Sequence, residues 1–290
     1  GFRRHRRDFP AEHERDLHGR DVLITGGTTG IGEAAARSLV ERGARVTVWA
    51  RDGSRGRRAS DAIGAAFSQV DLGDLDQVAI AANTYAPTAL AAVVLNAGAM
   101  PLERTLTAAG HELIWASQVL GHLLILRVLH ARGLLGPQTR VIWVSSGGMY
   151  AQRLDLRDLT WANGYQRHTA YANAKRAQVL LGEHLAERWP EVPMAVMHPG
   201  WVQTDAVKLS MPLFHALTRP ILRTPAEGAD TIVWLVAREQ APTSGLFWFD
   251  RSPQPTHLRT ATHTRPADRS SLVERVFADT DPWLSAEVNP

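Results

Sequence analysis

Residues 21–32 read Asp21-Val-Leu-Ile-Thr-Gly-Gly-Thr-Thr-Gly-Ile-Gly32, a short apolar run that passes directly into a glycine-rich turn. A parallel strand covered on both faces reads as such a nearly continuous apolar run. Glycines are needed where a turn is tight and the backbone must approach a ligand closely, and the N-terminus of a following helix offers free N–H groups and a positive dipole end. The stretch therefore predicts a strand, a turn that binds a phosphate-bearing ligand, and a helix that begins near Ile31.

The same rhythm continues along the chain, where short apolar runs alternate with helix-length segments. Apolar residues recur at helical spacing within Ile31–Leu39 and Ala174–Leu185, which predicts two amphipathic helices. The strand-like runs are Val22–Thr25, Val46–Ala50, Ala92–Leu95, Val141–Val144, Met194–Met197 and Gly245–Phe249. Repeated βαβ units of this kind predict an α/β fold: a single Rossmann-type, doubly wound parallel sheet of about seven strands with helices on both faces.

Some segments fall outside this rhythm. We expect residues 1–20 to form an N-terminal leader, residues 21–250 the domain that contains the sheet, and residues 251–290 a C-terminal tail that is irregular until Leu272. Within the domain, residues 201–224 follow a strand and carry prolines and bulky apolar residues, which predicts a flap over a ligand.

Composition argues against several classes of function. The chain of 290 residues has no cysteine and its 12 histidines show no ligand spacing such as HExxH, so we expect neither disulfides nor a metal site. The formal net charge of +3 is small and the basic residues are scattered, apart from a solvated cluster at Arg3, Arg4, Arg6 and Arg7, so nucleic acid is not an expected partner. No apolar run approaches the roughly 18 residues of a membrane span, and no signal-peptide core follows the basic start. We expect a cytoplasmic protein without a membrane span, and homo-oligomerisation stays open.

Polar and basic residues follow the ends of successive strands, where ligands bind in open α/β sheets. Arg51 comes first after the second strand, where an arginine fork can grip a 2′-phosphate, whereas an acid such as the neighbouring Asp52 would accept from a free ribose hydroxyl. We therefore favour NADP(H) as the cofactor and keep NAD(H) open. The expected cofactor-binding residues up to the fourth strand are Thr25, Gly26, Thr28, Thr29, Gly30, Ile31, Gly32, Arg51, Asp71, Leu72, Asn96, Ala97 and Gly98.

A tyrosine and a lysine stand one helical turn apart in Tyr171-Ala-Asn-Ala-Lys175. At i and i+4 both side chains project from one face of a helix, so a phenol and an ammonium can share one substrate. We expect the ammonium to lower the pKa of Tyr171 toward a range useful for acid–base chemistry. Ser146 ends the fifth strand at the same sheet edge, where its hydroxyl can hydrogen-bond a substrate oxygen. An ordinary surface tyrosine and lysine are the rival interpretation, but the chain has only four tyrosines, and its lysines are Lys175 and Lys208.

Together these residues resemble the short-chain dehydrogenase/reductase family. The resemblance spans about residues 18–250, in the right order, and rests on TGGTTGIG at Thr25–Gly32, NAG at Asn96–Gly98, VSS at Val144–Ser146, YANAK at Tyr171–Lys175 and PGWVQT at Pro199–Thr204. It implies that Tyr171 exchanges the proton, that Lys175 holds the nicotinamide ribose and tunes the tyrosine, and that Ser146 positions a carbonyl. It also implies that the nicotinamide is lined by Pro199, Gly200, Val202 and Thr204.

One position departs from the family's pattern. The family usually has Asn, which supports a water between the lysine and solvent, where this chain has Gln118. Glutamine carries the same amide one methylene farther out. We therefore place Gln118 in the catalytic group with the expectation that the proton relay is displaced or lost.

The sequence thus predicts an NADP-dependent oxidoreductase that transfers a hydride between nicotinamide and the carbonyl or secondary alcohol of a small to medium, fairly apolar compound. The apolar substrate site is expected at Met149, Tyr150, Trp201, Met211, Leu213 and Phe214, although packing within the flap explains these residues almost as well. Two other classes stay open. One is an NADP(H)-binding regulatory protein without efficient turnover, for which Gln118 argues. The other is a sugar-nucleotide epimerase, which fits less well because those proteins generally use TGxxGxxG and carry a larger C-terminal substrate domain.

Overall fold

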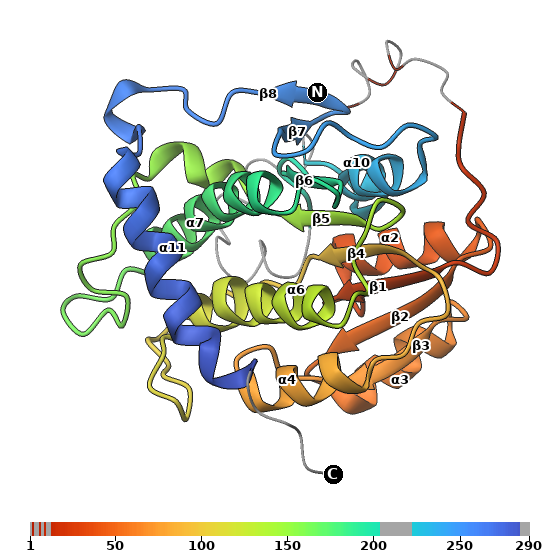
Figure 1. The fold of residues 1–290 in the computed structure, drawn as a ribbon, viewed down its shortest axis with the longest axis horizontal. Helices are drawn as coiled ribbons and strands as arrows, with labels where there is room; N and C mark the ends of the chain where they lie inside the picture. The colour runs from red at the N-terminus through yellow and green to blue at the C-terminus, as the bar shows by residue number, and fades with distance from the viewer. Residues whose placement is uncertain (1, 3–5, 7–8, 10–12, 204–221, 285–290) are drawn as a thin grey trace.

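The computed structural model describes residues 2, 6, 9, 13–203 and 222–284. Within these residues eight strands form one sheet in the order β3-β2-β1-β4-β5-β6-β7-β8 (Figure 1). Neighbouring strands are parallel as far as β7, and β8 pairs with β7 in the antiparallel sense. The predicted fold class is confirmed, with one strand more than expected. Because the winding reverses between β1 and β4, a crevice forms at the carboxyl ends of these two strands.

The strands are β1 Asp21–Thr25, β2 Arg45–Ala50, β3 Ala66–Gln69, β4 Leu90–Leu95, β5 Arg140–Val144, β6 Met194–Met197, β7 Phe247–Phe249 and β8 Ser252–Gln254. The α-helices are α2 Gly30–Val40, α3 Gly53–Asp61, α4 Leu75–Thr84, α5 Leu113–Trp115, α6 Gly121–Ala131, α7 Arg167–Arg188, α10 Pro225–Ala237 and α11 Pro266–Thr280. Other helical segments are the π-helix η2 Ala116–Leu120 and the 3-10 helices η3 Gly147–Ala151, η5 Thr260–Thr262 and η6 Asp281–Trp283. Each predicted strand run corresponds to an observed strand.

Helices cover both faces of the sheet. Successive residues of β1 point to opposite faces, so Val22 and Ile24 join a core under α2 and α10, whereas Leu23 joins the core under α4, α6 and α7. All three side chains are fully buried. This two-sided burial explains why the opening stretch of sequence is apolar without alternation.

The turn between β1 and α2 needs glycine for steric reasons. Gly26 and Gly30 have φ angles of +69° and +58°, which L side chains rarely adopt. A Cβ on Gly32 would lie 2.3 Å from the Gly26 carbonyl oxygen and 2.4 Å from the side-chain nitrogen of Asn96. The turn therefore packs tightly against the end of β4, and the N-terminus of α2 opens on the crevice.

One continuous helix, Leu113–Ala131, combines α5, η2 and α6 and is long and apolar enough to cross a membrane by length and composition. This corrects the expectation that no apolar run approaches such a length. In the structure 78% of its 18-residue apolar window is buried, because it packs against α4, α7 and α11. The burial fits a core helix.

Described residues of both terminal segments, Arg15 of the leader and Ser252–Trp283 of the tail, pack onto the domain, which the sequence did not predict. β8 and α11 lie in the tail that was expected to be irregular until Leu272, and α11 already begins at Pro266, where the fixed φ and missing N–H of proline suit a first helical position. Figure 1 shows α11 lying across α7 and α6. In the leader, the Arg15 guanidinium donates to carbonyl oxygens beside β4, β5 and α10. Most of the predicted flap, residues 204–221, lies outside the described residues.

Candidate active site

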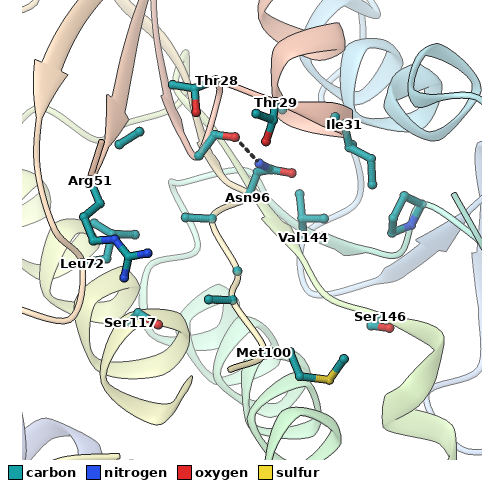
Figure 2. A pocket seen from close by; sticks show the side chains of 18 of the residues that line it. Thr28, Thr29, Ile31, Arg51, Leu72, Asn96, Met100, Ser117, Val144 and Ser146 are labelled. Carbon is teal, nitrogen blue, oxygen red and sulfur yellow. Dashed lines mark hydrogen bonds between the residues drawn. The ribbon is translucent and has the colours of Figure 1, made fainter. Parts of the chain in front are cut away.

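A cavity of about 570 Å³ opens at the carboxyl ends of β1, β2, β4 and β5. Figure 2 shows Arg51 at one end of this cavity and Ser146 at the other, with Thr28, Thr29 and Ile31 of the glycine-rich turn between them. The predicted site residues that line it are Gly26, Thr28, Thr29, Gly30, Ile31, Gly32, Arg51, Asp71, Leu72, Asn96, Ala97, Gly98, Ser146, Tyr171, Lys175, Pro199, Gly200, Trp201 and Val202. Segments far apart in the sequence therefore meet at one site.

Asn96 braces the glycine-rich turn from the end of β4. Its side-chain amide donates to the carbonyl oxygens of Thr25 and Gly26, at 3.1 and 3.0 Å. The backbone N–H groups of Asn96 and Ala97 donate to the Thr25 hydroxyl, at 3.0 and 3.1 Å. Thr25 is fully buried and does not line the cavity, so it supports the turn from beneath.

His122, which sequence analysis did not identify, extends this support into the core. Its Nε2 lies 3.0 Å from the Thr25 hydroxyl oxygen, and the ring is fully buried. Burial and, to a lesser extent, the charge of Lys175 lower the pKa of His122 to about 3, so the ring is neutral at physiological pH. A neutral imidazole beneath the turn adds no charge of its own to the cofactor region.

Arg51, Asp52 and Arg55 lie at the end of the cavity opposite Ser146. Asp52 caps the N-terminus of α3: its carboxylate accepts from the Arg55 backbone N–H at 3.0 Å and from the Ser54 hydroxyl at 3.2 Å. The backbone hydrogen bond is the main cause that lowers the pKa of Asp52. Arg55, in the first turn of α3, lines the cavity together with Arg51, and it was missed because nothing in its sequence context marks it.

Ser146, Tyr171 and Lys175 meet at the other end of the cavity. The Ser146 hydroxyl accepts from the Gly148 N–H at 3.2 Å and so caps η3. The Lys175 Nζ donates to the Val144 carbonyl at 3.0 Å and lies 5.3 Å from the centroid of the Tyr171 ring. Lys175 is only 2% exposed, and burial lowers its pKa to about 7.

The pKa of Tyr171 shifts in the direction opposite to the one expected from the neighbouring Lys175. Burial raises the pKa of Tyr171 above 10, and the hydrogen bond from Ser146 offsets only part of that rise. The physical reason is that an unsolvated phenolate is costly, and the buried lysine is itself only partly charged near neutral pH. Tyr171 is therefore held in its protonated form.

Gln118 lies behind the cavity, within the π-helix η2, and does not line it. Its Nε2 donates to the Ala99 carbonyl at 2.6 Å, and its Oε1 is buried with no hydrogen-bond partner among the described residues. Its backbone carbonyl accepts from the Gln178 Nε2 at 2.8 Å. The wider turn of a π-helix leaves backbone carbonyls free to accept other hydrogen bonds. Here the Gln178 side chain supplies the donor to the Gln118 carbonyl.

The loop after β6 also lines the cavity, through Pro199, Gly200 and Val202, the residues that the family resemblance places beside a nicotinamide. Gly200 has a φ of +79°, and the Arg223 guanidinium lies where a Cβ would project. Arg223 also pairs with Asp250, at 2.5 and 2.9 Å. The fourth residue of the predicted set, Thr204, lies outside the described residues.

The predicted substrate residues separate in the structure. Trp201 lines the cavity and is 54% exposed. Met149 is fully buried in the core, and the Tyr150 hydroxyl donates to the Pro255 carbonyl at 2.8 Å; neither residue lines the cavity. Met211, Leu213 and Phe214 lie outside the described residues. Lining residues that the sequence did not reveal include Met100, Leu113 and Ser117, because loop residues and a helix N-terminus carry no periodic signal.

Comparison with known proteins connects this geometry to a family. A model described as the NAD dependent epimerase/dehydratase family matches residues 22–202. Dehydrogenase/reductase SDR family member 12 of Bos taurus is 37% identical over 94% of this chain and 90% of its own length. Human retinol dehydrogenase 12 is 34% identical over 81% of this chain and 78% of its own length.

The shared fold extends to solved structures. A short chain dehydrogenase from Burkholderia cenocepacia, crystallised in complex with NADP, has a TM-score of 0.65 and 21% identity, covering 80% of this chain and 96% of that chain. This chain belongs to the short-chain dehydrogenase/reductase (SDR) family of oxidoreductases, which act on CH–OH and C=O groups.

Proposed function

We propose that this protein transfers a hydride between NADP(H) and the carbonyl or secondary alcohol carbon of a small to medium, apolar compound, with Tyr171 as the general acid and base. One observation carries the proposal: a single cavity has Arg51 and Arg55 at one end and Ser146, Tyr171 and Lys175 at the other. A nicotinamide dinucleotide also has two unlike ends, a phosphate-bearing adenosine that suits the arginines and a reacting nicotinamide that suits Ser146, Tyr171 and Lys175.

The residues of the cavity fit such a cofactor. At the glycine-rich turn, a Cβ on Gly26 would lie 2.7 Å from the Ala97 Cα, so the turn packs against β4 without side chains that would fill the phosphate position. Residues at the N-terminus of α2 would hold the pyrophosphate, Lys175 the nicotinamide ribose, and Gly200 and Val202 the nicotinamide face.

The preference for NADP(H) over NAD(H) rests on the hydrogen bonds that the Asp52 carboxylate already accepts within the protein. Its carboxylate already caps α3, which competes with any role in accepting from a ribose hydroxyl. Arg51 and Arg55 stand beside it as donors suited to a 2′-phosphate. The electrostatics at this end of the cavity therefore favour the phosphorylated cofactor.

Fluorescence titration with NADPH and NADH tests this preference. We expect Arg51→Ala to weaken NADPH binding by about ten- to a hundredfold, because charge-assisted hydrogen bonds are the strong ones, while NADH binding changes little. Arg57→Ala is a matched control, since Arg57 lies on α3, six residues after Arg51, and is exposed like Arg51 but does not line the cavity. Equal affinity of the wild-type protein for the two cofactors would contradict the preference.

Tyr171 is suited to donate a proton, because its raised pKa keeps the phenol protonated near neutral pH. When bound, the nicotinamide supplies the hydride that adds to the carbonyl carbon. Tyr171 gives its proton to the carbonyl oxygen and becomes a phenolate, while the Ser146 hydroxyl donates to the same oxygen and stabilises its developing charge. Lys175, as an ammonium one turn away, offsets the phenolate charge until a proton returns from solvent. Alcohol oxidation runs the same transfers in reverse.

An apolar substrate is supported by the residues beside the reacting centre. Met100 and Leu113 line the cavity, and the indole of Trp201 stands at its edge. Retinol, the substrate named for one relative, is itself an apolar alcohol, which agrees with this surface. We infer that apolar contact, rather than a charged anchor, selects the substrate.

Gln118 supports the competing function, an NADP(H)-binding protein with little turnover, because its side-chain amide donates to the Ala99 carbonyl and Gln118 does not line the cavity. NADPH oxidation, measured against aldehydes and ketones of increasing apolar size, separates the two functions. We expect turnover, with kcat/KM rising with apolar size. Tight NADPH binding with no turnover on any compound would favour the regulatory function.

A further inference from the structure

A fully buried arginine follows directly after the catalytic-centre lysine. Arg176 has no exposed surface, and its guanidinium donates only to backbone carbonyls: Nε to Gln152 at 3.2 Å, Nη2 to Met149 at 2.7 Å and Nη1 to Thr256 at 2.7 Å. Among the described residues no ion pair includes it. A buried charge that makes no direct ion pair is costly, so these three carbonyls, together with the charge of the nearby Glu183 carboxylate, must offset the cost of desolvation.

Two of the three carbonyls lie at the C-terminal end of η3, on Met149 and on the C-cap residue Gln152. The Met149 carbonyl accepts from both the Gln152 N–H and the guanidinium, so Arg176 binds the C-terminal end of this short helix. The N-cap at the other end of η3 is Ser146. Arg176 thus binds the C-terminal end of η3. The N-cap residue at the opposite end, Ser146, carries the hydroxyl that hydrogen-bonds to Tyr171.

The third carbonyl ties this arrangement to the C-terminal part of the chain. Thr256 follows β8, and the preceding residue, Pro255, accepts from the Tyr150 hydroxyl of η3. The same C-terminal segment therefore holds η3 through Tyr150 and α7 through Arg176. Tyr171 also lies on α7. The Arg176 side chain therefore connects the helix that carries Tyr171 to η3, whose N-cap is Ser146.

We propose that Arg176 is a positioning residue for the reaction, which fixes the Ser146 hydroxyl relative to the Tyr171 phenol by holding the C-terminal end of η3 and residue Thr256 against α7. The inference rests on the hydride transfer proposed above. Lysine at this position would keep the charge but could not place donors at all three carbonyls, because it lacks the planar fork.

A double-mutant cycle with Ser146→Ala tests whether Arg176 acts through the serine. In the wild-type background, Arg176→Lys should lower kcat by roughly ten- to a hundredfold, as misplacement of a reacting group does, with the Kd for NADPH changed less than about twofold. In the Ser146→Ala background the same substitution should change kcat less than about twofold, because the group that it positions is gone. Equal losses in both backgrounds would overturn the proposal.

Hydrogen–deuterium exchange gives a readout that does not depend on turnover. The N–H groups of Gly148, Met149 and Gln152 are hydrogen-bonded in η3, and Arg176→Lys should make them exchange about tenfold faster. The matched control is Arg140→Lys: Arg140 is also buried and donates to three carbonyls, Leu235, Val236 and Glu239, but it stands at the opposite end of β5.

The two variants must differ for the proposal to stand. Arg140→Lys should leave exchange over residues 147–152 unchanged, even where it lowers the melting temperature. Unchanged exchange over these residues in Arg176→Lys would overturn the positioning role, whether or not a substrate is known. If no carbonyl compound is turned over by the wild-type protein, the proposed function fails, and the exchange result still decides the role of Arg176.

Discussion

Lys175 places an ionisable amine where its side chain is almost inaccessible to solvent. Its side chain is 2% exposed and its pKa falls from 10.5 to about 7. Between these two pH values the unfolded chain binds more protons at this position than the folded chain, so the contribution of Lys175 to stability rises with pH across the window and is lowest at and below about pH 7. The protein thus accepts a stability cost at neutral pH to place an amine beside Tyr171.

Lys175→Met should raise the free energy of unfolding at pH 7, because methionine fills similar space without a charge to desolvate. The gain should shrink as the pH rises toward about 10, because giving up the proton on folding costs less as the pH nears the pKa of 10.5 that the amine has in the unfolded chain. Urea denaturation at both pH values measures the difference. A gain of equal size at both, or a loss at pH 7, would show that the burial of the amine is not what costs stability.

Single residues differ in how far the sequence predicts them. Tyr171 and Lys175 could be identified because helical spacing places them on one face whatever surrounds the helix. The direction of the Tyr171 pKa shift could not, since burial outweighs the charge of a nearby lysine and burial is a property of the fold. Arg55 and His122 were missed for the same reason: their roles depend on which strand ends lie beside them.

At the scale of elements, the turn from β1 into α2 is the part of the site whose backbone is most constrained by its neighbours. Gly32→Ala should weaken NADPH binding by about tenfold or more, because the new Cβ would meet the Gly26 carbonyl and the Asn96 amide and push both out of place. Gly136→Ala is the control, since nothing lies within 4 Å of a Cβ at that position. Titration of both variants checks the prediction, and unimpaired binding by Gly32→Ala would mean that the turn is not the pyrophosphate site.

Strands and helices with strong periodicity were predictable, whereas the π-helix η2 was not. Ala116–Leu120 is only five residues long and lies inside an apolar helix, so no pattern of residue types marks the change in hydrogen bonding. The change nevertheless decides where the Gln118 carbonyl points and allows Gln178 to bond it. The departure at position 118 was visible in the sequence, but its consequence needed the fold.

At the scale of the whole molecule, the C-terminal helix completes the core over α6 and α7. Leu272 and Val276 of α11 are fully buried, and the Arg127 side chain of α6 donates to Phe277, Thr280 and Asp281. The tail escaped prediction because its prolines and polar residues resemble a linker, and its few apolar residues have a partner surface only once the sheet has formed. Residues 251–284 are therefore part of the domain.

Leu272→Ala should lower the free energy of unfolding by about 2–5 kcal/mol, the usual cost of a cavity at a buried leucine. Leu258→Ala, at a position that is 64% exposed, should change it by less than about 0.5 kcal/mol. Chemical denaturation compares the two variants. Equal and small effects would show that α11 is not an integral part of the folded domain.

The central claim is that Tyr171 delivers the proton to a carbonyl oxygen over a bound nicotinamide. Single-turnover oxidation of enzyme-bound NADPH by a carbonyl substrate, compared between the wild-type protein and Tyr171→Phe, tests it most directly. We predict that the phenylalanine variant binds NADPH with an affinity within about twofold of wild type but oxidises it at least a hundredfold more slowly, since only the proton donor is lost. Single-turnover rates that are equal in the two proteins would contradict the account.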